Sequence, residues 1–99
     1  MTFKKTEMRI PNLLYGDRVV VAYAKDGVAV ARVGKAWGVF HATEGCEIFY
    51  RLQRRTKAEA TAAAEKVLAL HIDWNKAPGD KQFDEDFRAV AGKIREIAG

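Results

Sequence analysis

A two-residue turn between two valine- and alanine-rich segments constrains the fold of this 99-residue chain more than any other feature. The segments are residues 18–24 and 28–33, and the Asp-Gly pair at 26–27 accommodates the positive φ angles of a tight hairpin turn. Such a turn places Tyr23 opposite Val30. Both faces of this hairpin are largely apolar, so we expect both to be covered, the second by a partner subunit or the C-terminal helix.

Two further strands are predicted at residues 36–43 and 46–53, joined by a turn at the Glu-Gly pair 44–45. Strand side chains alternate between the two faces of a sheet. The alternation in the last strand directs Ile48, Tyr50 and Leu52 toward the core.

The same register places two aromatic rings on the outer face of these strands. Phe40 and Phe49 would form an exposed pair beside Arg51. Aromatic rings next to cations are what single-stranded nucleic acids use for base stacking. The alternative, which the sequence leaves open, is that the second helix covers both rings.

A first helix is predicted over residues 57–75. Thr56 is a suitable N-cap, and Glu59 three residues later completes a capping box. Apolar residues recur downstream at helical spacing, and we expect the helix to pack on the sheet through the last four of them. These residues are Ala60, Ala63, Ala64, Val67, Leu68, His71 and Trp74.

A second helix is predicted over residues 81–98, after a stop at Pro78-Gly79 and with Asp80 as its N-cap. Its apolar residues step by four and three, in a heptad-like stripe. The stripe is formed by Phe83, Phe87, Val90, Ile94 and Ile97. It either docks on the protein's own core or forms the interface of a homodimer.

Residues 1–17 carry the weakest signals. A short edge strand near residues 4–9, ended by Pro11, is one interpretation. A flexible basic arm containing Lys4, Lys5 and Arg9 is the other. The expected fold is therefore α+β in one domain: a four-stranded antiparallel meander within residues 18–55, followed by two C-terminal helices.

Positive charge is concentrated in the predicted sheet. Residues 1–57 hold eleven lysines and arginines against five acids, whereas residues 58–99 hold six against eight. A directional field of this kind steers a polyanion to one face, and a helix N-terminus adds free N–H donors for phosphate. The nucleic-acid-binding residues expected from this pattern are Arg32, Lys35, Phe40, Phe49, Arg51, Arg54, Arg55 and Lys57.

The run TKAEATAAAEKVLAL, residues 56–70, resembles the last helix of double-stranded-RNA-binding domains in its opening Thr56-Lys57 and its alanines. With the preceding hairpin, it is also similar to the arm-type DNA-binding domain of phage tyrosine integrases. These resemblances imply a sheet followed by a helix that binds RNA or DNA. The second lysine expected in the RNA-binding version is Ala58, and no helix precedes the predicted sheet.

No catalytic constellation is recognisable, so a non-enzymatic protein is expected. His41, His71 and Cys46 are too scattered for a zinc site, and no phosphate-binding glycine loop or cofactor motif occurs. A single cysteine, with neither a leader segment nor a long apolar run, predicts a cytoplasmic protein without a membrane span. The alternative function is a phage or bacterial regulatory protein that binds itself or a host protein through its C-terminal helix.

Overall fold

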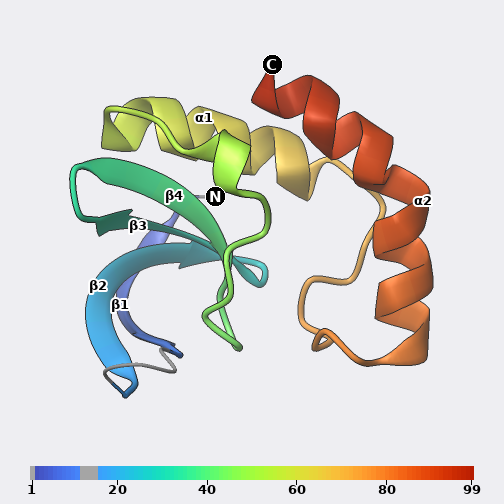
Figure 1. The fold of residues 1–99 in the computed structure, drawn as a ribbon, viewed down its shortest axis with the longest axis horizontal. Helices are drawn as coiled ribbons and strands as arrows, with labels where there is room; N and C mark the ends of the chain where they lie inside the picture. The colour runs from blue at the N-terminus through green and yellow to red at the C-terminus, as the bar shows by residue number, and fades with distance from the viewer. Residues whose placement is uncertain (1, 12–15) are drawn as a thin grey trace.

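A four-stranded antiparallel sheet followed by two helices forms the fold in the computed structural model, which describes residues 2–11 and 16–99 (Figure 1). The strands lie in the order β1-β2-β3-β4, so each pairs with its neighbour in sequence. The α+β class and the meander followed by two C-terminal helices are thereby confirmed. The strands are β1 Lys4–Ile10, β2 Arg18–Lys25, β3 Val28–Val33 and β4 Ala36–His41.

The central hairpin has the predicted turn and register. Asp26 and Gly27 both adopt positive φ angles, 49° and 88°, as the turn chemistry requires. Tyr23 of β2 lies opposite Val30 of β3. This part of the fold follows directly from the local sequence.

β2 pairs along its other edge with β1, which is formed by the N-terminal segment. β1 pairs along its whole length with β2, from Lys4 opposite Ala24 to Ile10 opposite Arg18. The edge-strand interpretation of this segment is therefore confirmed, and the flexible-arm interpretation is wrong for residues 4–10. Pro11, which has no N–H donor, follows the last strand residue.

The predicted strand at residues 46–53 is wrong, and the sheet therefore does not extend to residue 55. Only two isolated bridges link this segment to β4, Glu47 to Phe40 and Arg54 to Trp37. The two bridges are three residues apart along β4 but seven residues apart along the partner segment. The additional residues of the partner segment form a 3₁₀ turn, Tyr50–Leu52. A 3₁₀ turn has three residues per turn, so Phe49 and Leu52 both pack toward the helices. Tyr50 is two-thirds exposed instead of facing the core.

The face of the sheet turned away from the helices is covered by the curl of the sheet itself. Met8 of β1 and Phe40 of β4 belong to one buried cluster although they lie on opposite edge strands. Figure 1 shows how strongly β1 and β2 bend. The residues between them in this cluster are alanines, small enough for the inside of a tight curl: Ala22, Ala29 and Ala31. This face of the hairpin is thus covered without a partner subunit, whereas the expectation that both faces are covered is wrong for β2, because Val19 and Val21 on its other face are 59% and 51% exposed.

The opposite face of the sheet carries the first helix. Helix α1, Lys57–Leu68, packs over β3 and β4. Its buried residues are Ala60, Ala63, Ala64 and Val67, as the helical spacing predicts. Valines of the sheet complete this core: Val28, Val30 and Val39.

The predicted end of the first helix, at residue 75, is wrong. Beyond Leu68 the chain turns, with Leu70 N–H donating to the carbonyl of Val67. Burial then alternates, so that Ile72 and Trp74 pack on the core while His71 is exposed. This alternation allows Trp74, at 2% exposure, to insert beneath the second helix.

Helix α2, Lys81–Ala98, has the predicted bounds and the predicted cap. The Asp80 carboxylate accepts hydrogen bonds from the backbone N–H groups of Gln82 and Phe83. Its apolar stripe packs on the protein's own core: Phe83 and Ile94 are buried, and the other three members are partly buried against the same cluster. The surface proposed for a homodimer is therefore largely used within one chain.

Candidate functional site

The N-terminal turn of α1 is built as its sequence predicts. The Thr56 hydroxyl accepts a hydrogen bond from the Glu59 N–H at 3.1 Å and donates one to the Glu59 carboxylate, also at 3.1 Å. The N–H groups of Lys57 and Ala58 have no hydrogen-bond acceptor in the described part of the chain. This turn therefore presents two backbone donors and the positive end of the helix dipole.

A groove lies beside this turn, and three of its lining residues are cationic. We call it the basic groove: it has a volume of about 390 Å³ and is lined by Lys35, Ala36, Gln53, Arg54, Arg55 and Glu59. Lys35 comes from the turn between β3 and β4, whereas the arginines come from the segment just before α1. The tertiary fold thus brings together cations that are twenty residues apart in sequence.

Arg54 lies in the groove, but its guanidinium is largely committed to the fold. It donates hydrogen bonds to the carbonyl oxygens of Ile97 and Ala98 at the C-terminal end of α2, both at 3.2 Å. It also donates to the carbonyls of Arg51 and Gln53. These contacts satisfy carbonyls that have no partner within α2 and oppose the negative end of its dipole. The structure therefore gives Arg54 a packing role that the sequence pattern did not suggest.

Arg51 is tied to the same end of α2. Its guanidinium donates to the Gly99 carbonyl at 3.3 Å. Of the four predicted cations around the start of α1, two are thus engaged with α2. Arg55 and Lys57 remain exposed at the helix start.

Two aromatic rings that the sequence analysis did not select lie beside these cations. The Lys57 ammonium lies over the Tyr23 ring, 3.3 Å from its centroid. Tyr23 in turn packs against Trp37 at 6.5 Å between ring centroids, and Trp37 is the cross-strand partner of Arg32. The confirmed hairpin register places Tyr23 on the same face as Val30, which is the face that packs against the helices. The predicted register therefore contained the information that could have placed this ring beside a cation of α1.

The predicted exposed pair of Phe40 and Phe49 is wrong. Phe40 is 5% exposed and packs inside the curl of the sheet. Phe49 packs against the cluster on the helix side and contacts Tyr50 edge-on at 5.3 Å. The two rings belong to different clusters and offer no shared stacking surface.

The cations of the basic groove are not neutralised by acids at salt-bridge distance. In residues 2–11 and 16–99 the one ion pair within 4 Å joins Arg9 to Asp17, at 3.8 Å, outside the groove. Glu59 is the single acid among the groove's lining residues, against Lys35, Arg54 and Arg55. The groove therefore carries excess positive charge in a concave surface, which favours an anion.

Other classes of site find little support in the described residues. No group of three or more histidine, cysteine, aspartate or glutamate side chains there is placed to hold a metal ion. Of the helices described, none has the length and apolarity to cross a membrane. His41 is buried at 1% exposure, with its Nε2 2.7 Å from the Lys76 carbonyl and its Nδ1 accepting the Glu44 N–H. This histidine therefore joins two segments of the fold.

The chain matched no protein-family model, no curated protein and no solved structure. What it does must therefore be inferred from its own residues.

Proposed function

We propose that this protein is a small non-enzymatic module that binds nucleic acid through its phosphate backbone. The contact surface comprises the basic groove, with Arg32 and Lys57 beside it. The observation that carries the proposal is the gathering of Lys35, Arg54 and Arg55 in one groove at the N-terminal turn of α1.

The two most available cations are Lys35 and Arg55. Both are exposed, and neither has a hydrogen-bond or ion-pair partner among the described residues. Arg55 offers the planar fork that suits a phosphate, and Lys35 offers a mobile ammonium. The free N–H groups of Lys57 and Ala58 add directed donors next to them.

The aromatic residues have a different role in this proposal from the one expected. Tyr23 and Trp37 are half-buried, and the ammonium of Lys57 lies over one face of the Tyr23 ring. Tyr23 therefore orients a cation and does not stack on bases. Binding is then dominated by phosphate contacts, which carry no sequence information.

The test replaces Lys35 and Arg55 together by glutamine and measures binding by fluorescence anisotropy. The matched control replaces Lys66 and Lys81, exposed cations at the far end of α1 and the start of α2, so that both variants have the same net charge. Duplex DNA, duplex RNA and single strands are titrated at several salt concentrations.

We expect the Lys35→Gln/Arg55→Gln variant to bind about tenfold more weakly at low salt and to lose about two units of slope in log Kd against log salt. The control should retain most of the affinity. Equal losses in both variants would mean that net charge alone, and not the groove, attracts the polyanion. Absence of binding by the unmodified protein at low salt would refute the proposal.

A further inference from the structure

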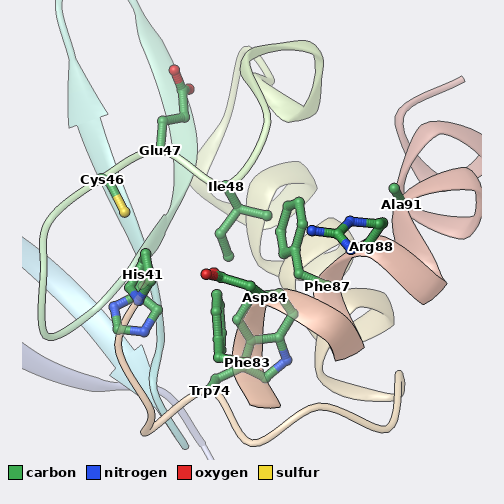
Figure 2. A pocket seen from close by; sticks show the side chains of 11 residues that line it. His41, Cys46, Glu47, Ile48, Trp74, Phe83, Asp84, Phe87, Arg88 and Ala91 are labelled. Carbon is green, nitrogen blue, oxygen red and sulfur yellow. The ribbon is translucent and has the colours of Figure 1, made fainter. Parts of the chain in front are cut away.

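A second concave site lies at the other end of β4, between the segment that follows this strand and the first half of α2. Its volume is about 480 Å³, within the range of about 300–1,000 Å³ usual for small-molecule pockets. Figure 2 shows side chains from three regions converging on it: the end of β4 with the following segment, the α1–α2 connection, and α2.

One wall of this pocket is made of packed aromatic rings. Trp74 contacts Phe83 at 5.7 Å and Phe87 at 6.2 Å between ring centroids, both nearly perpendicular. Phe83 and Phe87 stack at 6.0 Å, and His41 meets Phe83 edge-on at 5.6 Å. The rings thus support one another in a rigid, largely apolar wall.

Beside the aromatic rings lies a carboxylate that forms no ion pair in the part of the chain that the structure describes. Asp84 is half-buried, and Figure 2 shows its carboxylate pointing into the space bounded by His41, Cys46, Ile48 and Phe83. Its Oδ1 accepts the Gly79 N–H at 3.1 Å. No lysine, arginine or histidine nitrogen of the described residues lies within 4 Å of it.

The other charged residues of the lining do not pair with Asp84. Glu47 also lines the pocket, but Figure 2 shows its side chain directed away from Asp84, and its Oε2 accepts a hydrogen bond from Gln53 at 2.9 Å. Arg88 is the one cationic residue of the lining, and it is exposed. Both ring nitrogens of His41 are already hydrogen-bonded within the fold, so neither is free to bind a ligand.

We propose that this pocket binds an organic cation, a primary or methylated ammonium group on a small apolar body. The ammonium would lie against Asp84, where a charge-assisted hydrogen bond is available, and the apolar body against Phe83 and Phe87. Aromatic faces beside a carboxylate are the combination that selects ammonium groups, since ring quadrupoles and the formal charge attract the cation together.

The proposal is tested by titrating the protein with benzylamine and two matched probes, benzyl alcohol and benzoate, and following backbone amide shifts by NMR. We expect benzylamine to bind at least about fivefold more tightly than benzyl alcohol, and benzoate most weakly. The shifts should centre on α2 and on residues 41–48. Equal binding of the amine and the alcohol would overturn the proposal.

The variant Asp84→Asn isolates the charge, because the asparagine oxygen can still accept the Gly79 N–H. It should lose the preference for benzylamine over benzyl alcohol, whereas Glu85→Gln, an exposed acid on the same turn, should keep it. A circular-dichroism melt establishes that each variant is folded. A second variant, Phe87→Leu, keeps an apolar side chain at this position but removes one ring, and it should weaken the binding of benzylamine more than that of benzyl alcohol.

The natural ammonium could belong to a free amine or to a lysine side chain of another protein. Titration with Nα-acetyl-lysine methylamide distinguishes these sources, since a protein ligand requires this probe to bind as well as benzylamine. The pocket and the basic groove share no lining residue. If the pocket does not bind an ammonium group, the nucleic-acid proposal is therefore unaffected.

Discussion

The guanidinium of Arg54 donates a hydrogen bond to the carbonyl oxygen of Ala98 at 3.2 Å, which joins the segment before α1 to the last turn of α2. The residues are 44 positions apart, so this contact closes a long stretch of chain. It also places a full positive charge at the negative end of the α2 dipole.

We therefore expect Arg54→Ala to destabilise the protein by about 1–3 kcal/mol, because several carbonyls lose a charged donor at once. Arg54→Lys should recover only part of this, since one ammonium cannot replace both Nη1, which donates to the Arg51 and Gln53 carbonyls, and Nη2, which donates to those of Ile97 and Ala98. Urea unfolding followed by circular dichroism measures both. The neighbouring Arg55→Ala is the control, and it should change the stability by less than about 0.5 kcal/mol.

Gly45 provides a second test of long-range closure. A Cβ at this position would lie 1.7 Å from the carbonyl oxygen of Arg9, so the turn after β4 is in close backbone contact with the end of β1. Gly45 also has a positive φ of 71°. Gly34 has a similar φ of 65°, but a Cβ added there would meet nothing within 4 Å.

Comparison of Gly45→Ala with Gly34→Ala separates these two effects. Each substitution carries the left-handed penalty of about 1–2 kcal/mol, and Gly45→Ala carries the clash with β1 in addition. We expect a difference of about 2 kcal/mol or more in the free energy of unfolding. Equal losses would show that β1 does not approach Gly45 this closely in solution.

The two histidines should respond very differently to substitution. His41 is buried and bridges Lys76 and Glu44, whereas His71 is exposed. His41→Ala should destabilise the protein by about 2–4 kcal/mol, because it leaves a cavity and two unsatisfied backbone groups. His71→Ala should have an effect within about 0.5 kcal/mol. Thermal melts of the two variants give this comparison directly.

The thiol of Cys46 is predicted to be a weak nucleophile at neutral pH. Desolvation of the thiol raises the pKa of Cys46 above its ordinary value; a backbone hydrogen bond lowers this pKa by a smaller amount, and the nearby Glu44 carboxylate makes the weakest contribution, which raises it. Iodoacetamide should therefore modify the folded protein more slowly at pH 8 than it modifies the urea-unfolded chain. A faster reaction in the folded state would contradict the raised pKa.

The same shift in pKa links stability to pH. The folded state holds the thiol proton more tightly than the unfolded state does, so this contribution to stability is complete below the ordinary thiol pKa of about 8.5. It is lost as the pH rises from there through the higher pKa of the folded state. In Cys46→Ser the decline in stability between about pH 8 and 10 should be smaller than in the unmodified protein.

The sequence by itself determined the parts of this protein whose signals act over a few residues. The Asp-Gly turn set the β2–β3 register, Thr56 and Asp80 set the starts of the helices, and helical spacing identified the buried face of α1. Turn chemistry, capping and periodicity are local, because each depends on dihedral angles and hydrogen bonds within about one turn of chain.

Only the tertiary structure decided which segment became the fourth strand and what the basic residues contact. Residues 46–53 alternate like a strand, but a 3₁₀ turn buries Phe49 and Leu52 together, and the fourth strand is instead β1, which pairs with β2 at the opposite edge of the sheet. In the sequence, Arg54 likewise does not differ from an exposed arginine. Its hydrogen bond to Ala98, 44 residues later, exists only because α2 packs beside it. These outcomes depend on contacts between segments that are distant in the sequence, and local patterns do not encode those contacts.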